Sequence, residues 1–305
     1  MTAKRSRLRA AIVTVEQDLH AFAVKQALEE RHGVECAIIE SDALADSAGL
    51  SWSEGPQTFT ATLPAREGRE VEVGALDVLW WRRFDGVAKI PADVSDPAAI
   101  DVITNDCRAT LMGILLTEFH GAWVSHPDAN RNAEMKLVQL RAARQAGFRV
   151  PQTLVSQHSE HIRRFCAALG NRVIVKSLTG TKKAALTTGI INDELLASDR
   201  TLRLSPAIYQ ELVPGSAHLR VQGFGDVFHA VRISCDHLDW RFKLNESKVE
   251  PYVLPAAMQQ RLRKVLRSLG LRMGIFDLKL APDGELVWLE VNPQGQFLFV
   301  ACLSG

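Results

Sequence analysis

The chain has few cysteines, and none is arranged as a cysteine-based zinc site would need. There is no Cys-x-x-Cys pair, and no histidines stand at the spacing that accompanies zinc-binding cysteines. Widely scattered single cysteines are typical of thiols that are kept reduced. We therefore expect a cytoplasmic protein with reduced thiols at Cys36, Cys107, Cys166, Cys235 and Cys302.

An excess of charge and a long apolar run are also lacking. Lys and Arg number 36 and Asp and Glu 35, a net charge of +1, which gives no support to nucleic acid as the main partner. Four basic residues near the start precede an apolar run, Ala10 to Val15, that is far too short for a signal peptide or a membrane span. We interpret the basic start as a solvated tail and expect no membrane partner.

Three nucleotide-binding signatures are missing. No Gly-x-Gly-x-x-Gly follows the first expected strand, which argues against a dinucleotide there. The P-loop pattern Gly-x-x-x-x-Gly-Lys-Ser/Thr and the protein-kinase motifs are absent as well. The sequence has no internal repeat or low-complexity segment.

The 305 residues form an ordinary globular composition, 47% hydrophobic and 23% charged, with room for two or three subdomains. Ala10–Val15 is expected as a buried strand, followed by a helix through 21–28 that ends near Gly33 and by a strand at Cys36–Ile39. This β-α-β order predicts a parallel, Rossmann-like sheet. The first domain is expected to close near Ala122 to Pro127.

The most informative segment lies near the end of the chain. Two apolar runs, Ile275–Leu280 and Leu286–Val291, flank an Asp-Gly pair, which is a strong hairpin signal. If Asp283 and Gly284 form a two-residue turn, Asp277 lies directly opposite Glu290. Alternate residues of a strand share a face, so Asn292 joins them.

An Asp, a Glu and an Asn oxygen on one sheet face are hard ligands suited to Mg²⁺ that carries nucleotide phosphates. The alternative is a solvated face of an exposed hairpin. The apolar residues around both charges favour an interior hairpin instead, where two close carboxylates are costly unless a cation lies between them.

Other charged residues at strand or helix ends fit nucleotide binding, although each alone is a weak signal. Lys176 closes an apolar strand beside a Gly/Thr loop, and Lys136 lies on a helix. Glu211, within Gln-Glu-Leu-Val, offers a carboxylate and main-chain groups to an adenine edge. Three arginines on or beside later strands are candidates for stabilising a transferred phosphoryl group: Arg220, Arg232 and Arg241.

The order of these residues resembles the ATP-grasp ligases over about Arg82 to Phe299. The matching segments are Asn132…Lys136-Leu-Val-Gln-Leu140, Gly147, Pro151-x-Thr153, Val-Ile-Val-Lys176, Gln-Glu211-Leu-Val-Pro, Leu-Arg220-Val, Asp239-Trp240-Arg241, Asp277 and Leu-Glu290-Val-Asn292-Pro-Gln-Gly-Gln296-Phe. Trp80-Trp81-Arg82-Arg83, the Lys-Leu-x-Gln-Leu helix and Asn-Pro-Gln-Gly-Gln-Phe297 are most similar to the graspetide (microviridin-type) synthetases, which macrocyclise ribosomal peptides. The ribosomal-protein glutamate ligases are the next relatives.

This resemblance implies an α/β protein with the ATP-grasp fold. An N-terminal Rossmann-like (pre-ATP-grasp) domain would cover residues 1–125. A central subdomain, 126–205, and a C-terminal subdomain with the metal hairpin, 206–305, would clamp ATP between them.

The resemblance also implies a role for each motif residue. Lys136 and Lys176 would contact the ATP phosphates, with Lys176 also near the adenine. Glu211 would accept a hydrogen bond from the adenine amino group, and Leu212 and Val213 would bind adenine through their main chains. The roles of the remaining residues are Mg²⁺ ligation by Asp277, Glu290 and Asn292, with Glu290 bridging two ions, and binding of the γ-phosphate and substrate carboxylate by Arg232 and Arg241, supported by Arg220.

Two features depart from the family pattern. Relatives usually carry Asp where this chain has His218; a neutral imidazole can still bond a ribose hydroxyl, and the alternative is a solvated loop residue. The chain also stops at Gly305, where relatives usually continue into a final helix, so a shortened or truncated terminus is expected.

The implied reaction activates an Asp or Glu side chain of a precursor peptide as an acyl phosphate, using ATP and Mg²⁺. A Lys or Ser/Thr of the same peptide then closes a lactam or lactone. Residues Lys182 to Arg203 are a candidate surface for the leader segment of that peptide, or else a nucleotide lid. The resemblance further suggests a homodimer through the first domain.

Two other functions stay open at this stage. One is a ligase that adds a free amino acid, such as glutamate, to a peptide or protein terminus. The other is a catalytically silent ATP-binding module. The full set of metal-ligand and phosphate-binding residue types speaks against a silent module.

Overall fold

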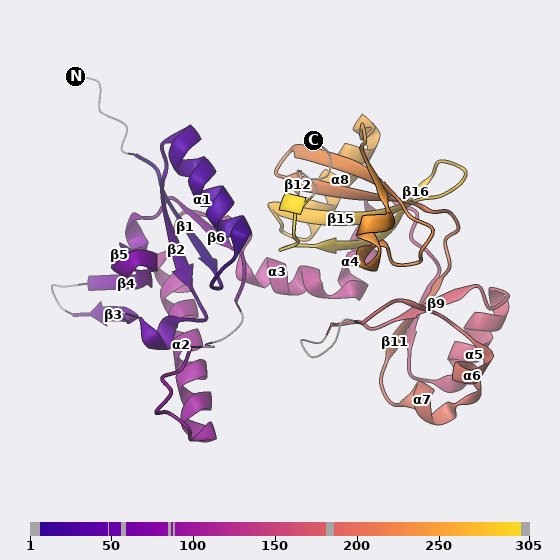
Figure 1. Cartoon of the computed structure of the whole chain (residues 1–305), viewed down its shortest axis with the longest axis horizontal. Coiled ribbons are helices and arrows are strands. Elements are labelled where there is room, and N and C mark those ends of the chain that lie inside the picture. Colours follow the sequence, from indigo (N-terminus) through magenta and orange to yellow (C-terminus); the bar gives the residue numbers. More distant parts are fainter. Residues whose placement is uncertain are drawn as a thin grey trace. The chain divides into compact units, whose positions relative to one another are not determined.

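The computed structural model describes residues 7–47, 49–55, 59–84, 87, 89–180 and 186–299. The chain divides into two compact units, Met1–Pro127 and Asp128–Gly305, coloured indigo to magenta and pink to yellow in Figure 1. The cysteines within the described ranges, Cys36, Cys107, Cys166 and Cys235, are free thiols, as expected. Cys302 and part of the candidate leader surface, residues 182–185, lie outside the described residues.

A four-stranded parallel sheet forms the centre of the first unit. Its strands, in spatial order, are β2 (Glu35–Glu40), β1 (Arg9–Thr14), β6 (Val78–Trp81) and β7 (Ala122–Val124). Helix α1 (Leu19–His32) joins β1 to β2; it begins after the capping carboxylate of Asp18 and ends at Gly33, whose φ is 63°. The expected strand, helix and strand at the start of the chain are therefore present.

The rest of the first unit is a small antiparallel sheet and a long helix. The elements are β3 (Ser51–Glu54), β4 (Phe59–Ala65), β5 (Arg69–Glu72), α2 (Pro97–Glu118) and the 3₁₀ turns Leu44–Asp46, Arg66–Gly68 and Val73–Ala75. Helix α2 packs through Leu111, Ile114 and Leu115 into a core shared with both sheets. No helix among the described residues is long and apolar enough to cross a membrane.

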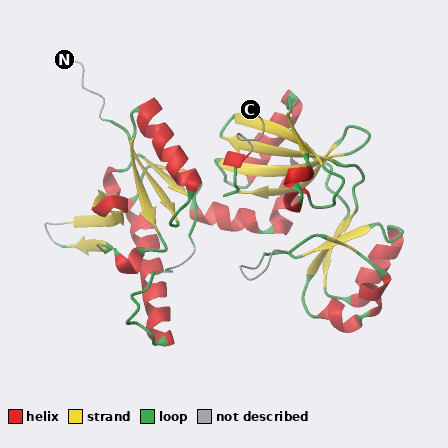
Figure 2. Ribbon diagram, in the orientation of Figure 1, coloured by secondary structure: helices red, strands yellow, loops and turns green. Residues whose placement is uncertain are grey.

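The second unit begins with two helices and a small antiparallel sheet. The helices are α3 (Pro127–Glu134) and α4 (Lys136–Gln145), and the sheet, in spatial order, is β10 (Gly189–Ile190), β9 (Val173–Lys176), β11 (Ala207–Glu211) and β8 (Thr153–Ser156). Helices α5 (Ser159–Ala168), α6 (Asp193–Ala197) and α7 (Asp199–Arg203) lie on one side of this sheet (Figure 2). Their contact face is apolar, with Ile162 and Leu202 almost fully buried.

A five-stranded antiparallel sheet completes the second unit. Its strands, in spatial order, are β14 (Lys248–Pro251), β13 (Val227–Ser234), β12 (Ala217–Phe224), β15 (Met273–Leu280) and β16 (Leu286–Asn292). Helix α8 (Ala256–Ser268) and α4 contribute to the core on one face, and the 3₁₀ turns Trp240–Phe242 and Leu244–Glu246 connect β13 to β14. Strands β12 and β13 form a hairpin at Gly225-Asp226, where Phe224 pairs with Val227 across a two-residue turn.

The β15–β16 hairpin confirms one prediction and corrects another. Asp277 pairs directly with Glu290, as predicted. The two-residue Asp283-Gly284 turn is wrong: Leu280 pairs with Leu286, and the Gly284 N–H donates to the Ala281 carbonyl at 2.9 Å, which closes a wider turn. A β-bulge between the turn and Asp277 shifts the register and brings Asp277 opposite Glu290.

Candidate active site

The site is built on a pair of carboxylates that face each other across β15 and β16. Trp288 and Val291 are both fully buried in the core on one face of the sheet. Strict alternation from Trp288 would send residue 290 to that same core face. The extra residue of the bulge resets the alternation, so Leu289 and Glu290 line a cavity on the other face with Asp277.

Each carboxylate is paired with one cationic side chain. Arg220 Nη1 donates to both oxygens of Asp277, at 2.9 and 2.7 Å, and Lys136 Nζ donates to Glu290 Oε2 at 2.7 Å. Arg220 comes from β12, directly opposite Asp277, whereas Lys136 opens α4. These contacts lower the cost of bringing two carboxylates close together in a partly buried site.

The two carboxyl groups differ in proton affinity. Burial raises the pKa of Asp277, and the nearby Glu290 raises it further against the opposing charge of Arg220. Burial alone would also raise the pKa of Glu290, but the charges of Lys136, Lys176 and Arg241 outweigh it and lower that pKa. The pKa values of the two carboxyl groups are therefore shifted in opposite directions.

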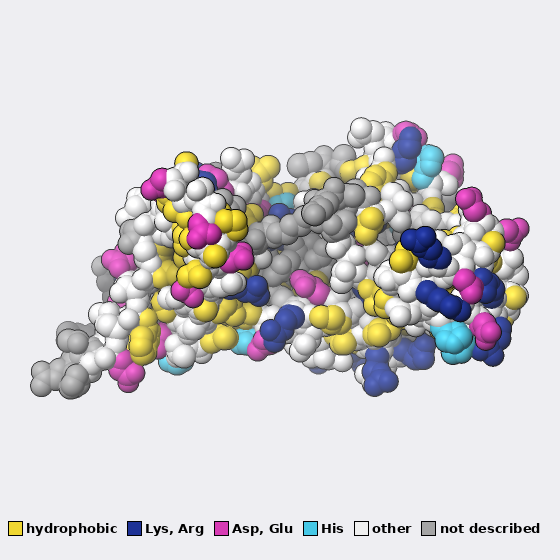
Figure 3. All heavy atoms as spheres, turned by 90° about the horizontal axis from the view of Figure 1, so that it is seen from below, with side chains coloured by type: hydrophobic (Ala, Val, Ile, Leu, Met, Phe, Trp, Pro, Cys, Tyr) yellow, Lys and Arg dark blue, Asp and Glu magenta, His cyan; other side chains and the backbone are white. Residues whose placement is uncertain are grey.

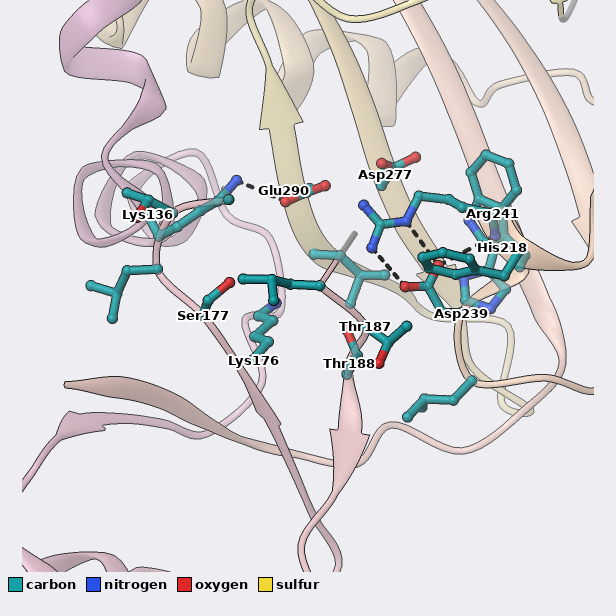
Figure 4. Close-up of a pocket in the computed structure, with 18 residues that line it drawn as sticks. Lys136, Lys176, Ser177, Thr187, Thr188, His218, Asp239, Arg241, Asp277 and Glu290 are labelled. Carbon is teal, nitrogen blue, oxygen red and sulfur yellow. Dashed lines mark hydrogen bonds and ion pairs between the residues drawn. The ribbon is translucent and has the colours of Figure 1, made fainter. Parts of the chain in front are cut away.

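A cavity of about 510 Å³ lies over the carboxylates. Figure 4 shows that Asp277 and Glu290 lie on the five-stranded sheet, across the cavity from Lys176 at the end of β9 and from the loop residues Ser177, Thr187 and Thr188. The labelled lining residues are Lys136, Lys176, Ser177, Thr187, Thr188, His218, Asp239, Arg241, Asp277 and Glu290. Three cations and three carboxylates thus converge on a space of nucleotide size.

Two of these cations are held in different ways. Lys176 ends β9, and burial lowers its pKa, with Lys136 and Arg241 lowering it further against the charge of Glu290. Arg241 is fixed by Asp239, which accepts from Nε at 2.8 Å and from Nη2 at 2.6 Å. These bonds raise the pKa of Arg241, so its guanidinium is a permanent charge at the cavity wall.

His218 is a buried neighbour of the cavity and not a solvated loop residue. Its Nε2 lies 3.0 Å from Nζ of Lys279, its cross-strand partner. Burial and the charge of Lys279 lower the pKa of His218 from its ordinary 6.5 to about 4. The imidazole is therefore neutral at physiological pH, as a hydrogen-bonding group for a ribose would be.

Six of the sequence-predicted residues do not line this cavity: Glu211, Leu212, Val213, Arg220, Arg232 and Asn292. Arg232 pairs with Leu219, so it lies on the opposite sheet face from Asp277 and is exposed. Glu211 accepts from Arg149 Nη2 at 2.9 Å and from the Gln152 N–H at 3.1 Å, and with Leu212 it lines a second cavity. Val213 is buried against Ala281 and Val287.

Asn292 lies on the same strand face as Glu290 by alternation but outside the cavity lining. It is exposed, and its Oδ1 accepts a hydrogen bond from the Gln294 N–H at 3.0 Å. Among the described residues no group of three or more His, Cys, Asp or Glu side chains could hold a metal ion. A metal here would rest on two carboxylates, with phosphate and water oxygens completing its shell, as Mg²⁺ prefers.

Sequence reasoning missed several cavity residues. Asp239 is part of the Asp239-Trp240-Arg241 segment, and its position two residues before Arg241 is the sequence signal for their ion pair. Leu289 follows from the bulge, which has no local sequence signature here. Ser177, Thr187 and Thr188 come from ordinary polar stretches, and no feature of the sequence marks them.

A scan against protein-family models gave no match, and a search of curated proteins gave none either. Solved structures do match over nearly the whole chain. The macrocyclase MdnC of Microcystis aeruginosa MRC, solved with its precursor peptide MdnA, is 23% identical with a TM-score of 0.85, over 96% of this chain and 94% of that one.

Two further structures agree with this match. A ligase from Chryseobacterium gregarium, described as a RiPP-associated ATP-grasp ligase and solved with ADP and a leader and core peptide, is 22% identical with a TM-score of 0.87, over 98% of this chain and 92% of that one. The ATP-grasp ligase PsnB, solved with a precursor variant, Mg and ADP, is 24% identical with a TM-score of 0.75, over 97% and 93%. The chain therefore has the mixed α/β fold of these ATP-grasp ligases.

Proposed function

We propose that this chain is an ADP-forming ATP-grasp ligase that closes lactam or lactone macrocycles in a ribosomal precursor peptide. The observation that carries the proposal is the Asp277–Glu290 pair, which lines a cavity of about 510 Å³ together with Lys136, Lys176 and Arg241. Its fold, which it shares with ligases solved with precursor peptides and ADP, supports the same reading.

In the first step a carboxylate oxygen of a peptide Asp or Glu attacks the γ-phosphorus of ATP. The bond to the leaving ADP oxygen breaks, and an acyl phosphate forms. Lys136, Lys176 and Arg241 supply fixed positive charge where the phosphates accumulate negative charge. Because all three line the cavity before any ligand arrives, little reorganisation is needed at the moment of transfer.

In the second step a Lys amine or a Ser/Thr hydroxyl of the same peptide attacks the acyl carbon. Phosphate leaves, the nucleophile loses a proton, and an amide or ester closes the ring. The net change in the peptide is the loss of one water for each bond. Holding both groups of one peptide in a single cavity makes the reaction effectively intramolecular.

The donor set fits Mg²⁺ together with ATP. Asp277 and Glu290 offer two carboxylates on one face, and each is hydrogen-bonded to one cation, Arg220 and Lys136 respectively. Bound there, Mg²⁺ would neutralise the β- and γ-phosphate charge. We also propose Asn292 as a ligand, because it follows Glu290 on the same strand face.

The nucleoside would lie toward residues 212–216, the segment between β11 and β12 that joins the two sheets of the second unit. We propose that Leu212 and Val213 bind adenine through their main chains and that Glu211 accepts from the adenine amino group after leaving Arg149. His218, neutral and lining the cavity, is proposed to bond the ribose. Arg232 is also proposed to bind phosphate or substrate, although it lies on the sheet face opposite to Asp277.

The three-part organisation is also a proposal. Residues 1–125 form the Rossmann-like pre-ATP-grasp domain, and residues 126–205 and 206–305 are the two subdomains that clamp ATP. The precursor's leader segment docks on the region 182–203; its described part exposes Leu186 and Ile190, and Figure 3 shows Lys and Arg side chains gathered over the α5–α7 part of the chain. A cytoplasmic homodimer without nucleic-acid or membrane partners completes the proposal.

The test is mass spectrometry of a candidate precursor peptide after incubation with the protein, ATP and Mg²⁺. The proposal predicts the loss of one water per bond formed. In Glu290→Gln, product formation is expected to fall at least about 100-fold, because the electrostatic role of the carboxylate is lost. The circular dichroism spectrum of the variant should match that of the wild type. Turnover near the wild-type rate would contradict the assignment of Glu290 as a metal ligand.

Other outcomes of the same experiment favour the alternatives. A gain of one amino-acid residue, with that amino acid supplied, would make the chain a ligase that extends a terminus. Tight ATP binding without any change in the peptide would make it a silent binding module.

A further inference from the structure

The buried side chain of Gln139, on α4, is bonded to the main chain of the strand that carries Glu290. Its Nε2 donates to the Val291 carbonyl at 2.8 Å, and the Val291 N–H donates to its Oε1 at 3.1 Å. Nε2 also donates to the Ala133 carbonyl. Gln139 is only 1% exposed, and its two N–H donors and its carbonyl oxygen are all bonded within the protein.

These bonds supply hydrogen-bond partners to main-chain groups at the free edge of β16. Strand β16 is the last strand of its sheet, so the main-chain groups of Val291 that point away from β15 have no neighbouring strand. One amide that both donates to and accepts from the same residue replaces such a strand. Further along the same edge, the Trp288 N–H donates to the Arg149 carbonyl at 2.9 Å.

The β-bulge lies between these two points of attachment. The main-chain N–H of Val291 donates to Gln139 of α4, and that of Trp288 donates to Arg149, which follows α4. The side chains of Trp288 and Val291 are both fully buried in the core. Only Leu289 and Glu290 fit between them, and both line the cavity. If the strand slipped by one residue, Glu290 would turn to the core face and leave Asp277.

We propose that Gln139 is a positioning residue: by holding the main chain of Val291 it fixes the bulge that aims the Glu290 carboxylate into the cavity. The same helix places Lys136, three residues earlier, against that carboxylate at 2.7 Å. Helix α4 thus holds both the main chain next to Glu290, at Val291, and the Glu290 carboxylate itself. The inference rests on the proposed function, in which Glu290 holds Mg²⁺.

The test compares Gln139→Leu with Gln139→Glu and with the control Gln259→Leu. Gln259 donates to the Leu254 carbonyl at 3.0 Å near the start of α8, so its loss removes a comparable bond away from the cavity. Mn²⁺ binding in the presence of ADP is followed by electron paramagnetic resonance. Amide hydrogen exchange of residues 286–293 is measured without any ligand.

Gln139→Leu is expected to weaken Mn²⁺ binding about 10- to 100-fold, the range for losing a residue that orients a metal ligand. It should also speed exchange at Val291. Gln139→Glu keeps the acceptor for the Val291 N–H and loses both donor bonds, so it should also weaken Mn²⁺ binding. This variant replaces Gln139→Leu in the test if Gln139→Leu does not fold. Gln259→Leu should leave Mn²⁺ binding unchanged.

A lower melting temperature with wild-type Mn²⁺ affinity in both Gln139 variants would overturn the inference, because Gln139 would then be a structural residue only. Unchanged exchange at Val291 would overturn it as well. If the wild type itself bound no Mn²⁺ with ADP, the proposed function would fall first and the positioning role with it; wild-type binding separates the two failures.

Discussion

The two faces of the five-stranded sheet come from the same strands and yet have opposite chemistry. One face buries Leu219, Phe276, Leu278 and Trp288 in the core formed with α4 and α8. On the other face, one residue away along each strand, lie His218, Arg220, Asp277, Lys279 and Glu290. The first four of these are less than 9% exposed.

The difference shows how a sheet can serve as core and site together. The apolar face is stabilised by the burial of its side chains, which does not depend on a bound ligand. On the polar face, the buried Asp277 is paired with Arg220. The Arg220 Cζ also lies 5.9 and 5.7 Å from the ring centroids of Trp240 and Phe299. Changes on the two faces should therefore have different consequences.

The largest effect is expected from Asp277→Asn. It leaves the buried Arg220 without its counter-charge, which costs about 3–5 kcal/mol of unfolding free energy. Urea unfolding measures the loss. The double variant Arg220→Met/Asp277→Leu should recover most of this stability without recovering activity, whereas a single variant as stable as the wild type would contradict the pairing argument.

On the apolar face, Leu278→Ala should cost about 2–5 kcal/mol by leaving a cavity. Leu278 is the neighbour of Asp277 but points the other way and is fully buried. ATP affinity per folded molecule, measured by calorimetry below the melting temperature, should stay at the wild-type value. A large drop in affinity would show that the two faces are not independent.

His218 makes the polar face sensitive to acid. Its pKa is lowered from 6.5 to about 4 in the folded protein, so the unfolded chain takes up a proton first as the pH falls below 6.5. The stability due to this group is present at pH 7 and is lost toward pH 4, by about 3 kcal/mol in all. His218→Gln should flatten the dependence of unfolding free energy on pH across that window, and an unchanged slope would contradict the assignment.

The smallest effect is expected from Arg232→Gln, compared with Arg241→Gln. Arg241 lines the cavity, whereas Arg232 is exposed on the opposite face. Arg232→Gln should change unfolding free energy by less than about 0.5 kcal/mol. If the sheet face decides the role, initial rates fall strongly in Arg241→Gln and little in Arg232→Gln; equal losses would support the sequence-based role of Arg232.

Much of the site could be predicted because its parts lie on short, well-marked elements. The Asp277–Glu290 pairing followed from two apolar runs around a turn, although the turn itself was wrong. The wider turn and the bulge offset each other in register by a single residue, and neither has a local signature that fixes its position. The prediction was therefore right at the site and wrong at the turn.

The positions of Arg232 and Glu211 could not be predicted for a physical reason. In β13 both faces are apolar, so the alternation of Val231 and Ile233 with Arg232 does not tell which face meets the cavity. In β11, Glu211 shares a face with Tyr209, opposite to Gln210. Such choices depend on pairing between distant strands, which the sequence of one strand does not contain.

The most direct test of the central claim follows oxygen atoms through the reaction. A precursor peptide whose Asp and Glu side-chain carboxylates carry ¹⁸O is incubated with the protein, ATP and Mg²⁺, and the released phosphate is analysed by mass spectrometry. If a carboxylate oxygen attacks the γ-phosphorus, one ¹⁸O appears in phosphate for each bond formed. Bond formation that releases only unlabelled phosphate would contradict the account.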